Sequence, residues 1–147
     1  MKLKNYNSSY HEALLDLFYN TLKNVNIKDY SKEQILAWAK ALNVQEFDIK
    51  LKQNHTLIAC KDREILGFAS MKIQDDFALL EYLFISYKHQ RQGIASLLCE
   101  NVESKIKTPI ITYASLSAKG FFEKRGYMCL KENKVQRSGI ELVNFTM

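Results

Sequence analysis

The sequence predicts an α/β fold, in which strands and helices share one core, from a change of hydrophobic period in the middle of the chain. Residues 77–85 are a short run of aromatic and aliphatic residues, which is typical of a buried strand. From Gln92 onward the apolar residues recur at helical spacing, at Ile94, Leu97, Leu98, Val102 and Ile106. The other segments also alternate between these two periods, which predicts the order β-α-α-β-β-β-α-β-α-β-β.

The other strands are marked by β-branched and aromatic residues between turn signals. They are expected over residues 2–6, 55–61, 64–74, 110–114, 127–135 and 141–146. Asp62-Arg63 and Arg137-Ser138-Gly139 are tight-turn sequences between strands that are adjacent along the chain. We therefore expect each of these two pairs of strands to form a hairpin.

The other helices are marked by their N-terminal caps. Ser9-x-x-Glu12 and Ser31-x-x-Gln34 are capping-box patterns, and each precedes a series of apolar residues at helical spacing. Residues 44–54 are ambiguous and are assigned no more than a further helical turn. Near the C-terminus, Ser115 or Ser117 is expected to cap a short helix that ends at a glycine.

Length and composition predict one soluble globular domain over residues 1–147. The chain is 47% hydrophobic and 25% charged, which is ordinary for such a domain. No run approaches the roughly eighteen apolar residues of a membrane span, and the N-terminus lacks the apolar segment of a signal peptide. We therefore expect no membrane association and a cytoplasmic location.

The formal net charge of +5 indicates an anionic partner. The lysines are scattered among acidic residues and form no block, which argues against nucleic acid and favours a polyanionic cofactor. The histidines share no spacing suited to metal binding, so no metal is expected. Cys60, Cys99 and Cys129 lie far apart and are expected to be reduced core residues.

The junction between the strand over 77–85 and the helix that follows it is suited to binding an anion. The first N–H groups of a helix lack partners within the helix and lie at the positive end of its dipole. Gly93 lets a bulky anion approach the backbone there, and Arg91 and Lys88 add positive charge. A pyrophosphate is the usual ligand of such a site.

Two blocks of sequence resemble the signatures of the GNAT N-acetyltransferases. Residues 90–95 read Gln-Arg-Gln-Gly-Ile-Ala and fit the Gln/Arg-x-x-Gly-x-Gly/Ala motif with which that family holds the pyrophosphate of acetyl-coenzyme A (acetyl-CoA). Residues 118–127 are similar to its second block, an Ala-x-x-aromatic-aromatic helix ended by Gly-aromatic. The expected order of elements matches the GNAT fold, a mixed, strongly twisted sheet of about seven strands with helices on both faces. Within the family, the chain looks like one group of small bacterial acetyltransferases.

The resemblance implies direct transfer of the acetyl group of acetyl-CoA to an amine in a ternary complex. In that family, the strand before the pyrophosphate loop diverges from its parallel neighbour, and its free backbone groups bind the pantetheine arm. The implied cofactor-binding residues are Leu83, Phe84, Ile85, Gln90, Arg91, Gln92, Gly93, Ile94, Ala95, Ser96, Ser115 and Phe122.

Glu81 is the candidate general base. It is the only carboxylate in its strand, and by strict alternation it shares a face of the sheet with Leu83 and Ile85. A carboxylate buried among apolar residues has its pKa raised toward neutrality, which suits a base. The alternative is a solvated Glu81, or one paired with a lysine.

The general acid is where the chain departs from the family pattern. Many GNAT enzymes carry a tyrosine at the second aromatic position of the helix block, but this chain has Phe122, which has no proton to donate. Ser115 also replaces an asparagine that is common in the family. Either water or another hydroxyl then protonates the thiolate, with Tyr113 and Tyr82 as the candidate hydroxyls, or the enzyme is slow. Phe122 is expected to pack against the pantetheine arm.

The acceptor is the least determined part of the sequence interpretation. Tyr30 and Trp38 are candidates for lining its pocket, although aromatic residues at helical spacing are more often core. A small-molecule amine is favoured, and a protein lysine or N-terminal amine is the alternative. A CoA-binding sensor or interaction module with little catalysis, which the absent tyrosine supports, is the rival function. A homodimer is compatible with this family.

Overall fold

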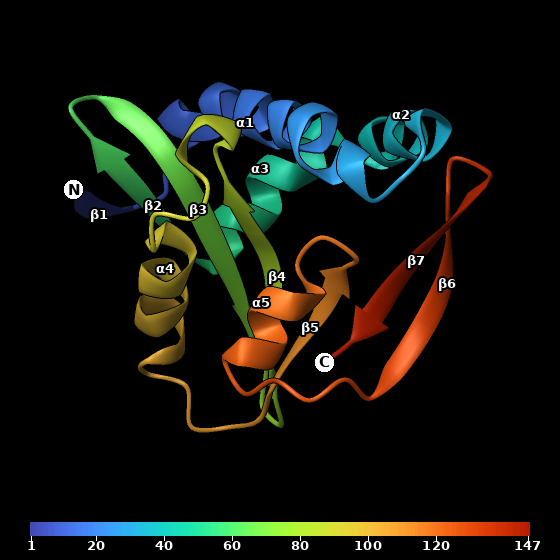
Figure 1. Cartoon of the computed structure of the whole chain (residues 1–147). Coiled ribbons are helices and arrows are strands. Elements are labelled where there is room, and N and C mark those ends of the chain that lie inside the picture. The colour runs from blue at the N-terminus through green and yellow to red at the C-terminus, as the bar shows by residue number, and fades with distance from the viewer.

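The fold is one mixed sheet of seven strands in the order β1-β2-β3-β4-β5-β7-β6, with helices on both faces (Figure 1). The computed structural model describes all of residues 1–147. The strands are β1 Lys2–Asn5, β2 His55–Lys61, β3 Glu64–Ile73, β4 Ala78–Ile85, β5 Ile110–Ser115, β6 Lys131–Arg137 and β7 Ile140–Thr146. The α-helices are α1 His11–Asn24, α2 Lys32–Ala41, α3 Val44–Gln53, α4 Ile94–Glu103 and α5 Lys119–Lys124. The expected mixed fold with helices on both faces is confirmed.

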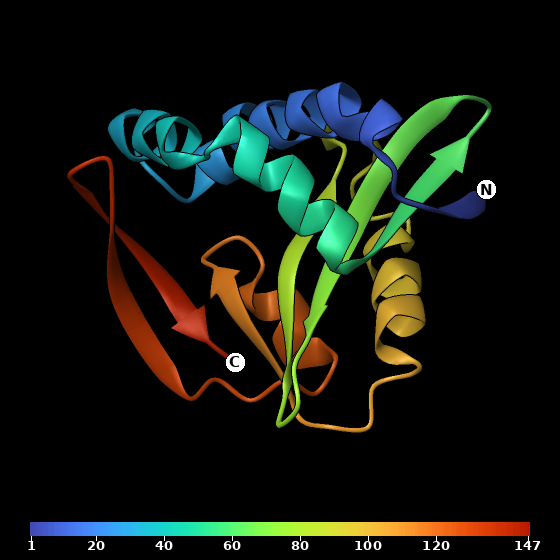
Figure 2. The ribbon, with the colours of Figure 1, turned by 180° about the vertical axis from the view of Figure 1, so that it is seen from behind.

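The two faces of the sheet carry separate apolar layers because neighbouring residues of a strand point to opposite sides. On one face, buried residues of α1 and α3 pack against Ile58 of β2 and Phe68 of β3. On the other face, α4 and α5 pack against Ala59 and Ala69, the next residues of the same strands. Figure 2 shows α3 lying across the first of these faces. No helix is long and apolar enough to cross a membrane.

The helices of the N-terminal half differ from the prediction at two places. Ser31 and Gln34 do form the predicted capping box of α2. The pattern at Ser9 does not form one, because Asn7 accepts the Ser9 N–H and caps a short 3-10 turn ahead of α1. Within the ambiguous segment 44–54, residues Val44–Gln53 form a full helix of ten residues, α3, with Asn43 as its side-chain cap.

Near the C-terminus, three predictions need correction. Neither Ser115 nor Ser117 is the N-cap of α5, although the Ser115 hydroxyl accepts the Ala118 N–H at 3.1 Å just before that helix. The strand expected from residue 127 begins only at Lys131. Cys129 lies in the exposed segment between α5 and β6, so only Cys60 and Cys99 are core cysteines.

Candidate active site

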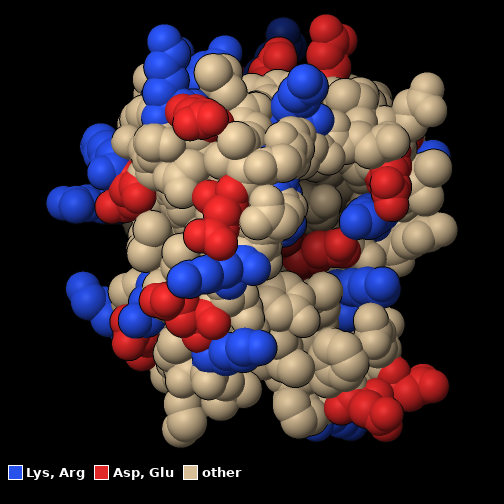
Figure 3. Space-filling model, turned by 90° about the vertical axis from the view of Figure 1, so that its right-hand side faces the viewer, with Lys and Arg blue, Asp and Glu red and all other residues tan.

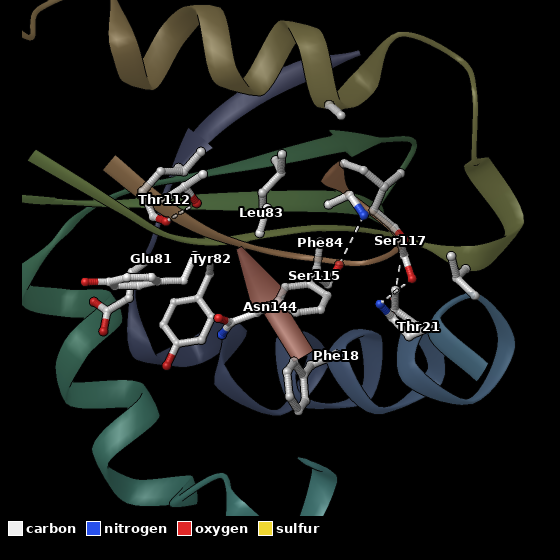
Figure 4. Close-up of a pocket in the computed structure, with 18 of the residues that line it drawn as sticks. Phe18, Thr21, Glu81, Tyr82, Leu83, Phe84, Thr112, Ser115, Ser117 and Asn144 are labelled. Atoms are coloured by element: carbon white, nitrogen blue, oxygen red, sulfur yellow. Dashed lines mark hydrogen bonds between the residues drawn. The ribbon is translucent and has the colours of Figure 1, made fainter. Parts of the chain in front are cut away.

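The site is the opening between β4 and β5, the only parallel pair of neighbouring strands in the sheet. These strands pair only from Ala78–Ile110 to Leu80–Thr112, where the Thr112 hydroxyl donates to the Leu80 carbonyl at 2.8 Å. Beyond that point β5 pairs with β7, and β4 continues alone on this side as far as Ile85. A cavity of about 930 Å³ occupies the opening (Figure 4).

The residues that the sequence interpretation assigned to a site line this cavity, except Lys88 of the anion-binding junction, which lies outside it. They are Tyr30, Trp38, Glu81, Tyr82, Leu83, Phe84, Ile85, Gln90, Arg91, Gln92, Gly93, Ile94, Ala95, Ser96, Tyr113, Ser115 and Phe122. The fold therefore brings together side chains from α2, the loop before it, β4, the β4–α4 loop, α4, β5 and α5.

The loop between β4 and α4 leaves the N-terminus of α4 open. Gly93 has φ +81°, a conformation that favours glycine, and no side chain caps the helix there. The Gln90 side-chain amide donates to the carbonyls of Ile85 at 2.7 Å and Ser86 at 3.2 Å, so it braces the loop. Arg91 lies in the same loop with its side chain exposed. An uncapped helix N-terminus beside a guanidinium can hold a phosphate.

A β-bulge places Glu81 at the floor of the cavity. Ser70 of β3 pairs with Tyr82, but the next residue, Met71, pairs with Leu80, so Glu81 is the extra residue of β4. As a result Glu81 and Tyr82 both face α3, whereas Leu83 packs into the layer formed by α4 (Figure 4). The expectation that Glu81 shares a face with Leu83 was wrong, because the bulge interrupts the alternation.

Polar partners surround the Glu81 carboxylate, whose side chain is 17% exposed. Lys50 Nζ lies 3.4 Å from Oε2, and Asn54 Nδ2 donates to Oε1 at 2.9 Å. Asn54 Nδ2 also donates to Ser70 Oγ at 3.0 Å, and Ser70 shares a 2.8 Å hydrogen bond with Thr56. The apolar surroundings predicted for Glu81 were wrong, and the alternative of a pair with lysine is observed.

The chain matches a known protein family over most of its length. The family model of the GNAT acetyltransferase domain matches residues 26–147. The chain belongs to the GNAT acetyltransferase family. It is an acetyl-CoA-dependent acyltransferase.

Individual relatives agree with this assignment. The chain is 27% identical to the uncharacterised N-acetyltransferase YafP of Escherichia coli K12 over 147 residues, which cover 100% of the chain and 94% of YafP. Its structure is similar to a GCN5-related N-acetyltransferase of Rhodopseudomonas palustris, with TM-score 0.89, 28% identity and coverage of 99% and 92%. The PaiA N-acetyltransferase of Thermoplasma acidophilum, solved with coenzyme A, shares the fold with TM-score 0.73 at 17% identity, with coverage of 98% and 96%.

In this acetyltransferase, two tyrosines near the opening differ in their surroundings. Tyr82 packs edge-on against Phe47 of α3, with ring centroids 5.2 Å apart. Burial, with the negative charges of Glu81 and Glu46, raises the pKa of Tyr82 to about 12. Tyr113 lies on β5, just past the point of divergence, and is 57% exposed. The Tyr82 hydroxyl is therefore protonated near neutral pH.

Phe122 and Tyr30 line the cavity and also take part in packing. Phe122 is 3% exposed and contacts the rings of Phe121 and Tyr127. The Tyr30 hydroxyl donates to the Val143 carbonyl at 2.7 Å and accepts the Leu116 N–H at 2.9 Å. The hydroxyl of Tyr30 thus joins β7 to the β5–α5 loop, and only its ring remains for the cavity.

The sequence interpretation missed the contribution of α3 and of the β6–β7 hairpin. Glu46 and Lys50 of α3 and Arg137 of β6 line the cavity, and only Lys50 has an ion-pair partner. Figure 3 views the face on which α2 and the hairpin lie, and acidic and basic side chains are interspersed around a hollow there. The cap at Asn43 and the i, i+4 spacing of Glu46 and Lys50 were the signals for this helix.

Proposed function

We propose that this enzyme transfers the acetyl group directly to a small-molecule amine in a ternary complex, with Glu81 as the general base. The observation that carries the proposal is the position of the Glu81 carboxylate. It lies at the bulge of β4, next to the point where β4 and β5 diverge, in the cavity that continues to the open N-terminus of α4. One carboxylate therefore faces the space between the cofactor end and the acceptor end.

The residues at the cofactor end suit acetyl-CoA, which supplies the thioester. Arg91 and the N–H groups at the start of α4 would hold the pyrophosphate. The backbone of Leu83, Phe84 and Ile85, beyond the last β4–β5 pair, would bind the pantetheine arm, except for the Ile85 carbonyl, which already accepts from Gln90. Free backbone groups at a strand edge need hydrogen-bond partners, and a pantetheine arm provides them.

Glu81 would take a proton from the ammonium of the acceptor, directly or through one water. Asn54 keeps its carboxylate in place, and Lys50 provides a compensating charge. Tyr113 is our candidate for protonating the leaving thiolate, because the residue lies on the diverging strand, lines the cavity and is exposed. Tyr82 remains the second candidate.

The acceptor end of the cavity supports a small amine. It is lined by residues of α2, α3 and the β6–β7 hairpin, and Trp38 is part of its wall. Glu46 and Arg137 lie in this part of the cavity without ion-pair partners. Unpaired charges in a partly enclosed cavity favour a polar or charged small molecule over a long polypeptide.

The test is a calorimetric titration of acetyl-CoA followed by thiol release across a panel of amines and lysine peptides. We expect acetyl-CoA binding, with turnover on one class of small amines. Turnover on lysine peptides alone would show that the acceptor is a protein and not a small molecule. Binding without any turnover would favour the CoA-binding module, for which the absent tyrosine at Phe122 is the specific argument. The cytoplasmic location and the homodimer stay predictions.

A further inference from the structure

Lys50 provides an amine beside the candidate base, and it belongs to the enzyme itself. Its Nζ lies 3.4 Å from Oε2 of Glu81, and its side chain is 40% exposed. It lines the same cavity as Glu81 and the β4 residues that follow, Tyr82 and Leu83. A lysine side chain has a flexible four-carbon stem, so its amine can move within the cavity without a change in α3.

The position of Lys50 is imposed by the fold. Lys50 stands in the last turn of α3, and Phe47 and Leu51 of that helix are each 1% exposed. These two side chains hold the helix against the sheet through the apolar layer that contains Phe68. The Lys50 side chain therefore faces the β4 bulge whenever α3 is packed.

We propose that Lys50 is an acetylation site of the enzyme, modified by its own active site when no acceptor amine is bound. The inference rests on the proposed function, in which Glu81 is the base and acetyl-CoA fills the opening between β4 and β5. Lys50 Nζ is then the amine of the chain that lies against the base.

The chemistry is the same as for an external amine. Glu81 accepts one proton from the Lys50 ammonium, and the freed nitrogen attacks the thioester carbonyl carbon. The C–N bond forms and the C–S bond breaks with its electron pair on sulfur. The second proton passes from nitrogen to the thiolate, so the products are Nε-acetyllysine, coenzyme A and one proton released from Glu81. No oxidant, reductant or further reactant is needed.

Acetylation would change the surroundings of Glu81. Lys50 is the one ion-pair partner of Glu81, and an acetylated lysine has no charge with which to form that pair. Asn54 would remain as its hydrogen-bond partner. Because Lys50 and an acceptor amine would use the same base, they are expected to compete.

Lys52 is a matched control within the same helix. Its side chain is 52% exposed and its Nζ lies 3.6 Å from Asp48, so it is also a lysine of α3 paired with a carboxylate. It does not line the cavity. Chemical acetylation by acetyl-CoA in solution would modify Lys52 at least as readily as Lys50, whereas acetylation by the active site would select Lys50.

The experiment is incubation of the purified enzyme with acetyl-CoA and no amine, followed by peptide mass spectrometry over time. We expect Lys50 to be acetylated at least about tenfold faster than Lys52, with a rate constant that does not change on dilution because the step is intramolecular. Glu81→Gln is expected to slow Lys50 about 100-fold and to leave Lys52 unchanged. An amine that the enzyme acetylates should slow Lys50 as it saturates the site.

Lys50→Arg separates the modification from the ion pair, since it keeps a positive charge but has no acetylatable amine. This variant should bind acetyl-CoA and show no modification at position 50. Equal acetylation rates at Lys50 and Lys52 would overturn the inference. So would an acetylation rate at Lys50 that Glu81→Gln does not change. If amines are acetylated while Lys50 is not, only the inference fails. If neither amines nor Lys50 are acetylated, the proposed function fails with it.

Discussion

Asn54 and Glu81 are joined across the layers of the structure, with Asn54 Nδ2 donating to Glu81 Oε1 over 2.9 Å. Asn54 is the C-cap residue that follows α3, and Glu81 is the extra residue of the β4 bulge. The same Nδ2 reaches Ser70 Oγ at 3.0 Å on β3, and Ser70 is completely buried. The direction in which the carboxylate points is therefore set jointly by a helix end and two strands.

Replacement of Asn54 tests this positioning. Asn54→Leu removes the donor to Glu81 and leaves Ser70 without that partner. We expect kcat to fall about tenfold or more, because a hydrogen bond to a charged group contributes about 1.5–3 kcal/mol. Acetyl-CoA affinity, measured by calorimetry, should be retained. Asn24→Leu is the control, since Asn24 bonds only within α1 and is exposed. Unchanged kcat in Asn54→Leu would show that Glu81 is held adequately by Lys50.

Glu81→Gln tests the base directly. The amide keeps the shape and the contact with Lys50 but cannot accept a proton from an ammonium near neutral pH. We expect kcat to fall about 100-fold or more with little change in acetyl-CoA affinity, because general-base catalysis contributes about 10²–10⁴-fold. Steady-state kinetics with the amine found in the panel would measure this. A variant with the kcat of the natural enzyme would rule Glu81 out.

Gly93→Glu tests the pyrophosphate loop. Gly93 has φ +81°, so a side chain there costs about 1 kcal/mol of backbone strain, and the carboxylate repels phosphate at the start of α4. We expect acetyl-CoA binding to be lost in calorimetry while the thermal transition remains cooperative. Gly139→Glu, at φ +79° in the β6–β7 turn, carries the same strain and charge away from the loop and should bind normally. Intact binding by Gly93→Glu would refute the assignment of this loop.

Tyr113→Phe and Tyr82→Phe distinguish the two candidate acids. Tyr113 is exposed to the cavity on the diverging strand, whereas Tyr82 faces α3 and packs against Phe47. We expect the first change to lower kcat about 100-fold and the second to have a smaller effect. Both are measured with the same amine under saturating acetyl-CoA. A larger loss in Tyr82→Phe would reverse the assignment, and no loss in either would leave protonation to water.

The raised pKa of Tyr82 also predicts that the unfolding free energy falls at alkaline pH. Its pKa rises from 10.0 to about 12 in the folded protein, mainly through burial. The unfolded chain therefore loses the proton first, and the stabilisation present below pH 10 is lost as the pH rises from about 10 to about 12. We expect the unfolding free energy, from denaturant titrations, to fall less steeply over this range in Tyr82→Phe. Identical slopes would show that Tyr82 does not contribute.

The features that were predicted correctly are those that depend on residues close together in the sequence. The strand over β4, the glycine at the start of α4 and the Ser31 capping box were all predicted, because each depends on residues within one turn or strand. The ten-residue helix α3 was not, because only its buried residues Phe47 and Leu51 reveal an apolar side. Because α3 supplies Lys50, failing to predict this helix also left part of the site out of the prediction.

The sequence by itself determined the fold class and the glycine at the start of α4, and it selected Glu81 as the candidate base, because these follow from residue type and spacing along a short stretch. The tertiary structure decided where Glu81 points and what surrounds it. A bulge depends on how β3 and β4 are paired, and a one-residue shift in register reverses the face of a side chain. Lys50 and Asn54 meet Glu81 only when α3 packs on the sheet, and no local pattern records such a long-range contact.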